Sequence, residues 1–471
     1  MAYGTTIPSI SRVSLTFLII SATIGKSTVI FSTANKRFFG GLLMFSPKLR
    51  ALARKCYLPN IGQNLLVLLK WTGFSLLSGL LIGGISTLFA KCLGKAIEFR
   101  SAYSWLLFLL PLAGLAITAL YRFCGQANDR GTNFVIASIH ANEETPARVA
   151  PLIFLSTILT QLCGGSAGRE GAALQIGGSL GNLLGKIVHL DDEDRHVLIM
   201  CGMSAAFAAL FGTPMAAAVF SLEMVSVGVM YYAALVPCVL SALIASHLAS
   251  MLGVHAEQFS IISIPGFSIQ GAIETVLLGI LCAAVSILLC MILHKVGGLL
   301  KTYVKNPYLR AIVSAVIVII LALILPDGRS YLGAGSNLIE QAIQEETIFP
   351  AAFLLKMLFT AVTLGGGFKG GEIVPSFCVG ASFGCFFGQL FGFAPSLCAA
   401  MGMVAVFCGV TNCPITSILI AFELFGFDSA HYMILVIAVS YAMSGYYGLY
   451  ADQTIVYSKY RTRFINRKTN H

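Results

Sequence analysis

Hydrophobic and polar positions follow one another along this chain in long blocks. Apolar runs rich in Leu, Ile, Val, Ala and Phe recur from about residue 65 to residue 450, and their length suits helices. An outer-membrane barrel would instead show short segments of alternating hydrophobicity, so the pattern predicts an all-α polytopic membrane protein. Runs shorter than the ~20 apolar residues that cross hydrocarbon must end inside a helix bundle. The predicted runs are 65–97, 103–121, 147–162, 172–188, 195–211, 215–225, 231–252, 272–304, 309–325, 351–363, 377–393, 397–410, 415–424 and 432–450.

Two glycine-rich breaks interrupt this pattern. Residues 164–178 read GGSAGREGAALQIGG and contain Glu170, and residues 365–375 read GGGFKGGEIVP and contain Glu372. Broken helices are tolerated at membrane depth where their freed N–H groups line a cavity or face a ligand, and an ionisable residue there is a functional candidate. Each break precedes an apolar helix, whose N-terminus carries positive partial charge. The two breaks therefore predict one anion site between two helix starts.

The chain also repeats itself. Residues 202–223 read GMSAAFAALFGTPMAAAVFSLE and match residues 402–423, which read GMVAVFCGVTNCPITSILIAFE. Coinciding positions include Gly202/Gly402, Met203/Met403, Ala205/Ala405, Phe207/Phe407, Pro214/Pro414 and Glu223/Glu423. Duplicated membrane halves with broken helices in matching positions are typical of a transporter or channel whose site lies near the bilayer midplane. Glu223 and Glu423 end equivalent helices, and we interpret them as structural residues that accept backbone or headgroup hydrogen bonds.

Charge placement suggests the topology and the domain boundaries. Of 471 residues, 57% are hydrophobic and 11% are charged. The net charge is +10, and the basic residues cluster near the two ends of the chain. We therefore expect a multi-pass plasma-membrane protein with both termini in the cytoplasm. The expected parts are an N-terminal basic segment over 1–63, a transport domain over 64–458 with halves at about 64–254 and 268–458, and a basic cytoplasmic tail over 459–471. Without a soluble basic domain, lipid headgroups and not nucleic acid are the expected partners.

Cysteine and histidine usage argues against a cofactor. The thirteen Cys and eight His are scattered, without a C-x-x-C pair or metal-ligand spacing, so we expect no metal and no other cofactor. The sequence also shows no nucleophile–His pair and no nucleotide-binding loop, so an enzyme is not expected.

The motifs resemble those of the CLC family of chloride channels and proton-coupled halide antiporters. Residues 168–171, GREG, resemble the family's filter motif, with Ala172 where proline is usual, and residues 371–375 resemble its G-x-F-x-P motif. AAFAALFGTPMAAAVFSLE resembles a helix pair of the family, and Tyr457 falls where the family places its pore tyrosine. The resemblance covers residues 64–458. It implies a homodimer with one anion pathway per subunit and an inverted repeat of tilted, partly broken helices.

The resemblance also assigns roles. Glu170 would be the gating glutamate, Tyr457 the central hydroxyl donor, and Thr132 the partner of the family's central serine. Met224 stands where the chloride antiporters of the family have their internal proton glutamate. The lack of that glutamate, together with Glu372 in the third motif, resembles the bacterial fluoride/proton antiporter branch. That branch usually carries methionine where Thr132 stands, and often threonine where Val374 stands, so both chloride and fluoride stay open as substrates.

We predict that backbone N–H groups and hydroxyls replace the hydration shell of the halide, because a full positive charge would trap it. The predicted anion-binding residues are Thr132, Asn133, Phe134, Gly168, Arg169, Gly171, Ala172, Ile373, Val374 and Tyr457. Glu170 and Glu372 are the predicted gating and proton-transfer residues, since burial and neighbouring anions disfavour a charged carboxylate. The predicted function is proton-coupled antiport of halide, and the alternative is a passive, voltage- or pH-gated chloride channel of the same fold.

Structural alternatives exist for three of these residues. Glu170 could simply pair with Arg169, although neighbours at a helix start are expected to point apart. Glu372 could be a permanently ionised helix-start carboxylate offset by Lys369. Tyr457 could be one of the interfacial tyrosines that are common near membrane ends.

Overall fold

The computed structural model describes residues 58–127, 129–140 and 145–470. The chain divides into two units, residues 1–70 and 71–471, and the described part of the first is the beginning of helix α3 (Leu58–Ala102). The predicted N-terminal segment over 1–63 lies almost wholly outside the described residues. All features below belong to the second unit.

The described residues are mainly helical. Their other α-helices are α4 (Leu110–Phe123), α5 (Thr132–His140), α6 (Val149–Leu162), α7 (Glu170–Ile187), α8 (Asp192–Phe211), α9 (Pro214–Glu223), α10 (Leu235–Met251), α11 (Ile269–Tyr303), α12 (Pro307–Ile324), α13 (Ser336–Glu340), α14 (Ala352–Gly365), α15 (Ile373–Phe391), α16 (Pro395–Thr411), α17 (Pro414–Phe425) and α18 (Ala430–Met443). Short helical turns are η2 (Ser104–Leu109), η3 (Tyr232–Ala234), η4 (Gly328–Tyr331) and η5 (Gln341–Glu345). The strands are β1 (Ser226–Val227), β2 (Thr454–Tyr457) and β3 (Phe464–Lys468).

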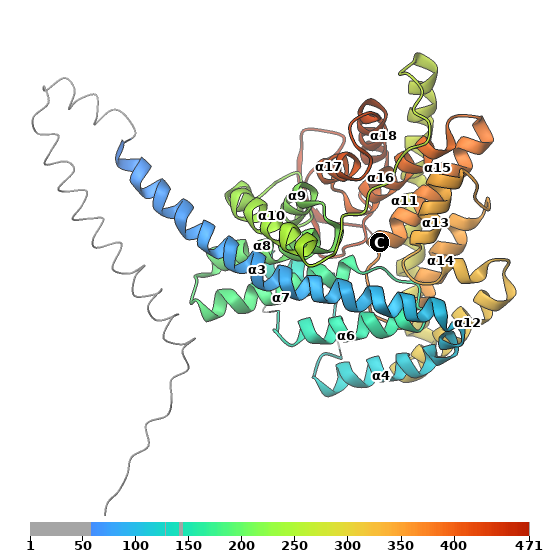
Figure 1. The fold of residues 1–471 in the computed structure, drawn as a ribbon, viewed down its shortest axis with the longest axis horizontal. Helices are drawn as coiled ribbons and strands as arrows, with labels where there is room; N and C mark the ends of the chain where they lie inside the picture. The colour runs from blue at the N-terminus through green and yellow to red at the C-terminus, as the bar shows by residue number, and fades with distance from the viewer. Residues whose placement is uncertain (1–57, 128, 141–144, 471) are drawn as a thin grey trace, which may run out of the picture. The chain divides into compact units, whose positions relative to one another are not determined.

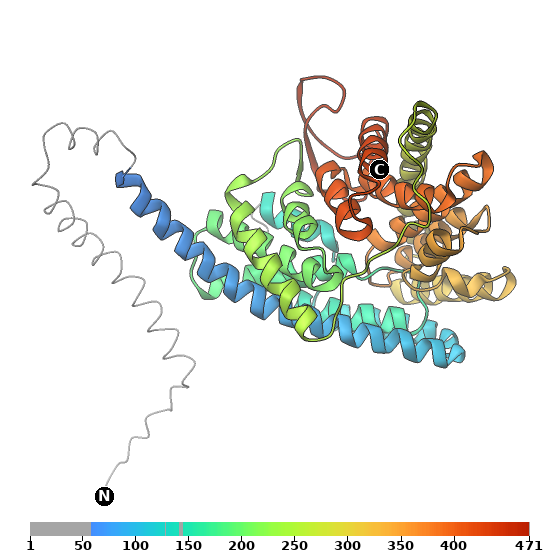
Figure 2. The same cartoon turned by 45° about the horizontal axis from the view of Figure 1, so that its top comes forward.

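Within the described residues, seven helical stretches are long and apolar enough to cross a membrane, and six more apolar helices have only 10 to 17 residues. This mixture confirms the predicted polytopic fold with partly broken helices. Figures 1 and 2 show α7 to α10 gathered on one side of the second unit and α15 to α18 on the other. The two groups correspond to the two halves of the sequence repeat.

Glycines set how closely the helices of each half approach. A Cβ atom at Gly177 of α7 or at Gly202 of α8 would clash with the carbonyl of the other residue, and the same holds for Gly380 of α15 and Gly402 of α16. Small residues let helix backbones come close enough for dense packing in a membrane protein. Each half therefore contains the same glycine-lined helix crossing, which confirms the duplication in space.

The two halves cap each other's helices. The Glu223 carboxylate at the end of α9 accepts hydrogen bonds from the N–H groups of Ile415 (3.1 Å) and Thr416 (2.8 Å) at the start of α17. Glu423 near the end of α17 accepts from Met215 and Ala216 (both 2.9 Å) at the start of α9. These donors have no partner inside their own helix. The structural interpretation of both glutamates is confirmed.

This exchange also reveals the orientation of the repeat. The end of α9 lies at the start of α17, and the end of α17 lies at the start of α9, so the two equivalent helices run antiparallel. The halves are therefore inverted with respect to each other, as expected.

The C-terminal residues form a small sheet that the sequence analysis missed. Strand β2 pairs with β1 in parallel and with β3 in antiparallel fashion. Beyond β3, the Thr469 hydroxyl donates to the carbonyl of Tyr450 (2.7 Å). Between β2 and β3, the Lys459 ammonium donates to the Ser444 hydroxyl (3.0 Å). The expected separate tail over 459–471 is thus part of the fold as far as Asn470. Strands of two to five residues are too short to give a readable alternation.

Candidate anion site at the helix starts

The two glycine-rich breaks meet, as predicted. Gly168 and Gly371 form an isolated antiparallel bridge in which Gly168 N–H donates to the Gly371 carbonyl (2.7 Å) and Gly371 N–H donates to the Gly168 carbonyl (2.9 Å). A Cβ atom at Gly371 would lie 2.5 Å from the Gly171 nitrogen, so only glycine fits there. The bridge places the starts of α7 and α15 side by side.

The bridge joins equivalent residues of the two halves. One offset of 203 residues relates Gly168 to Gly371, Gly177 to Gly380, and the start of α7 to the start of α15. At this offset, Glu372 is the counterpart of Arg169, and Ile373 is the counterpart of Glu170. The two glutamates therefore lie in equivalent breaks but at different positions.

Glu170 occupies the place that the sequence predicts for an anion. Its side chain is fully buried, and its Oε2 atom accepts hydrogen bonds from the N–H groups of Val374 (3.3 Å) and Arg169 (2.9 Å). Val374 lies in the first turn of α15, where N–H groups lack partners within the helix. The carboxylate thus sits on the positive end of the helix from the other half.

Arg169 contradicts the expectation that neighbours at a helix start point apart. Its Nε atom lies 3.5 Å from Oε1 of Glu170, and its Nη2 atom also binds the Glu257 carboxylate. Arg169 precedes α7 as its N-cap residue, and its long side chain lets the guanidinium reach back to the adjacent carboxylate. Pairing with Arg169 and occupation of the anion site therefore coexist for Glu170.

Helix α5 contributes a third helix start. Thr132, its first residue, is buried, and its hydroxyl lies 3.5 Å from the carbonyl of Gly171. Asn133 and Phe134 are only partly buried, and the Asn133 side chain accepts a hydrogen bond from the Asp452 N–H (3.2 Å). Among these three predicted residues, Thr132 is the one whose side chain has a described contact with a glycine-rich break, the first one, at Gly171.

Glu372 is the N-cap residue of α15 and is partly buried. The cation expected to offset it, Lys369, instead forms an ion pair with Asp129 (2.7 Å) and lies 4.2 Å from the ring centre of Tyr121. Lys369 therefore forms its direct ion pair with Asp129 and acts on Glu372 only as a neighbouring positive charge. Ala172, Ile373 and Gly171 are buried, as a site below the surface requires.

The structure does not bring Tyr457 to the site. Tyr457 lies on β2 with 48% of its surface exposed, and its ring packs against Phe464 of β3. Tyr450 is only 2% exposed, and its hydroxyl has no hydrogen-bond partner among the described residues. A buried hydroxyl with a free donor makes Tyr450, and not Tyr457, the candidate tyrosine of the site. Its position at the end of the last apolar run, before the polar Asp452, was the sequence signal that could have identified it.

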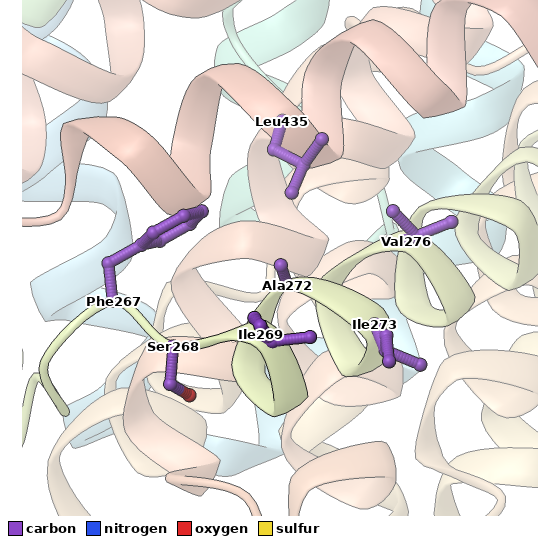
Figure 3. Close-up of a pocket in the computed structure, with 7 residues that line it drawn as sticks. All are labelled: Phe267, Ser268, Ile269, Ala272, Ile273, Val276 and Leu435. Carbon is purple, nitrogen blue, oxygen red and sulfur yellow. The ribbon is translucent and has the colours of Figure 1, made fainter.

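A separate pocket of about 510 Å³ opens between the start of α11 and α18. Figure 3 shows its lining, which includes Phe267, Ile273 and Leu435 and contains no charged side chain. The pocket is not lined by any of the predicted site residues, and apart from Ser268 its walls are apolar.

Comparisons with known proteins agree with this geometry. The family model described as voltage gated chloride channel matches residues 113–445. A chloride/fluoride channel protein of Pseudomonas syringae pv. tomato is 36% identical over 397 residues, which cover 83% of this chain and 88% of that protein. An H(+)/Cl(−) exchange transporter of Vibrio cholerae serotype O1 is 25% identical over 383 residues, which cover 74% of this chain and 81% of that protein.

Two solved structures extend the likeness. The crystal structure of a CLC-type fluoride/proton antiporter has a TM-score of 0.79 and 34% sequence identity, and the match covers 82% of this chain and 98% of that chain. A slow cyanobacterial Cl⁻/H⁺ antiporter has a TM-score of 0.68 at 19% identity, covers 79% of this chain and 94% of its own, and shows the fold alone. From its sequence, its fold and these matches, the chain belongs to the CLC family of voltage gated chloride channels.

Proposed function

We propose that this protein carries halide ions, chloride or fluoride, across the plasma membrane by proton-coupled antiport, with Glu170 as the gate. The observation that carries this proposal is the Glu170 carboxylate on the start of α15, where it accepts the Val374 N–H. A carboxylate in an anion site competes with the halide for the same donors. Protonation removes its charge and frees the site, which couples proton binding to halide entry.

The halide would be held by partial charges. The Gly168 N–H already donates to the Gly371 carbonyl, so Gly168 shapes the site without donating to the ion. The proposed donors are the backbone N–H groups from Arg169 to Ala172 and at Ile373 and Val374, the start of α5 at Thr132, Asn133 and Phe134, and the hydroxyl of Tyr450 in place of Tyr457. These groups replace the hydration shell without trapping the ion. Arg169 lies beside them with its charge shared between two carboxylates.

Glu372 is the proposed second proton carrier. Met224 is buried at the position where chloride antiporters of the family hold a glutamate, and it cannot titrate. Glu372 stands at the start of α15, whose first-turn Val374 N–H is bound by Glu170, and the buried Tyr450 hydroxyl has no partner among the described residues. On these features we base a proton route along Glu372, Tyr450 and Glu170.

The assembly is proposed to be a homodimer with both termini in the cytoplasm. Met215 of α9 and Ile415 of α17 occupy equivalent positions of the repeat, and both side chains are exposed on the isolated subunit. A second copy of the chain, or lipid, would cover these apolar side chains.

The test uses the purified protein in liposomes, with halide efflux and pH recorded together. The wild type should move protons against a halide gradient, and Glu170→Gln, which keeps the shape and cannot titrate, should lose this coupling while its halide flux persists or is blocked. Halide flux without proton movement in the wild type would indicate the passive channel instead. Wild-type proton movement in the variant would remove Glu170 from the mechanism.

A further inference from the structure

Arg169 connects the buried gate to the protein surface. Its guanidinium binds Glu170, whose side chain is 0% exposed, and Glu257, whose side chain is 39% exposed. Arg169 itself is 21% exposed, so the three charges form a row from the core outward. Two carboxylates from different parts of the chain therefore share one cation directly beside the anion site.

Glu257 reaches Arg169 from the segment that joins the two halves of the repeat. This segment follows α10 and precedes α11, and it is fixed to the second half by hydrogen bonds from Phe259 N–H to the Leu424 carbonyl (3.0 Å) and from Ile262 N–H to the Ser396 hydroxyl (3.1 Å). Ala256, next to Glu257, lies so close to Gly212 that a Cβ atom added at Gly212 would clash with it. The backbone around Glu257 is thus held in place on both sides.

The positive charge of Arg169 needs a second compensating carboxylate when Glu170 is protonated, and Glu257 can supply it. While Glu170 is ionised, its carboxylate compensates much of the guanidinium charge. Once Glu170 is protonated, that compensation ends, and Arg169 would face the arriving halide as a full positive charge. Ion pathways need sites that bind strongly enough for entry and weakly enough for release. An uncompensated arginine would therefore hold the halide too long.

We propose that Glu257 is a positioning residue that holds Arg169 beside the gate and compensates its charge in the part of the cycle when Glu170 is protonated. The inference rests on the proposed halide transport and adds a residue that acts through Arg169 without touching the ion. Arg169 is also oriented by Phe211, whose ring centre lies 5.7 Å from its guanidinium carbon. Loss of Glu257 should therefore leave Arg169 close to the site with its charge exposed to the halide.

The experiment measures initial rates of halide transport against halide concentration in liposomes, for E257Q, R169Q and the double variant R169Q/E257Q. The matched control is E274Q, which removes a glutamate that is partly exposed, as Glu257 is, and that accepts a hydrogen bond from Gln270 on α11. E257Q should lower KM by about fivefold or more and lower the maximal rate with it, as expected when an ion is held too tightly. The ratio of protons to halide should stay at the wild-type value, because Glu170 is intact.

The double variant separates charge compensation from a merely structural role. If Glu257 acts through Arg169, R169Q/E257Q should regain much of the maximal rate that E257Q loses, since the uncompensated charge is gone. Kinetics of E257Q that equal those of E274Q would overturn the proposal. A fall in rate at unchanged KM that the double variant does not recover would also overturn it. A wild type that moves no halide would instead refute the proposed function, before any variant is compared.

Discussion

The exchange of caps between α9 and α17 leads to a quantitative prediction about stability. Glu223 accepts three hydrogen bonds, from the N–H groups of Ile415 and Thr416 and from the Thr416 hydroxyl (2.6 Å), whereas Glu423 accepts two. Glutamine at either position keeps one acceptor oxygen and turns an NH₂ group toward N–H donors. The change thus removes a charge-assisted bond and leaves at least one helix-start donor unpaired. For Glu223 the hydrogen bond from Thr416 is buried, whereas for Glu423 the bond from Ala216 is only part-buried and the bond from Met215 is exposed.

The size of the effect follows from these bonds. A hydrogen bond to a charged group contributes about 1.5 to 3 kcal/mol, and an unpaired buried donor costs about 1 to 3 kcal/mol. The favourable interaction of a carboxylate with a helix start adds up to ~2 kcal/mol in partly buried positions. We therefore expect Glu223→Gln to lower the free energy of unfolding by about 3 to 5 kcal/mol and Glu423→Gln by about 2 to 3 kcal/mol.

Buried cysteines provide the assay. Ten of the twelve cysteines among the described residues are buried, so a thiol-reactive dye should label the folded protein slowly and the unfolded protein quickly. Unfolding in detergent, followed at one heating rate, should rank the proteins as wild type, Glu423→Gln and Glu223→Gln in falling order of stability. The double variant should lose less than the sum of the two, because both caps hold the same pair of helices.

Two results would refute this reasoning. Unfolding of both single variants at the wild-type temperature would mean that the caps do not stabilise the helix pair. Loss of proton coupling in Glu223→Gln, with the protein still folded, would mean that Glu223 has a role in proton transfer that its three hydrogen bonds do not suggest. Glu274→Gln serves again as the control for the loss of one negative charge.

Three further predictions concern the site. Tyr450→Phe should weaken halide binding by about threefold to tenfold, the effect of one lost hydrogen bond, whereas Tyr457→Phe should leave binding unchanged; titration of the halide against transport rate checks both. Glu372→Gln should reduce or abolish proton coupling while the protein stays folded, and liposomes with normal coupling would show that Glu372 is only structural. Thr132→Met should shift the flux ratio toward fluoride, because a hydroxyl donor to the larger halide is lost; an unchanged ratio in mixed halide would leave Thr132 as a helix cap alone.

The breaks and the repeat could be predicted from the sequence because glycine stands at the positions where backbones approach closely. Gly168 and Gly371 are glycines for a local steric reason, so the meeting of their two loops follows from composition and position. The end of the last run was predicted too late, at residue 450, because α18 stops at Met443 before a positive-φ glycine, Gly445. A helical run alone does not reveal such a turn.

Other parts of the site depend on contacts between distant segments. The link between Arg169 and Glu257 arises from the path of the connecting segment, which has no periodicity to read. Tyr457 lies on the short strand β2 with an exposed side chain, whereas Tyr450 precedes the strand and is buried. The sequence alone does not show this difference. Lys369 forms its ion pair with Asp129, which is distant in sequence, and not with its sequence neighbour Glu372.

The bridge between Gly168 and Gly371 has an implication for the origin of the fold. A contact between equivalent residues lies on the two-fold axis that relates the halves, so two identical half-length chains could form the same bridge with each other as an isologous pair. Such a pair would carry the same side chain on both sides of the axis. Fusion into one chain removes that constraint and allows Arg169 opposite Glu372, and Glu170 opposite Ile373. A single chain can therefore carry different side chains at the two equivalent helix starts, which two identical half-length chains could not.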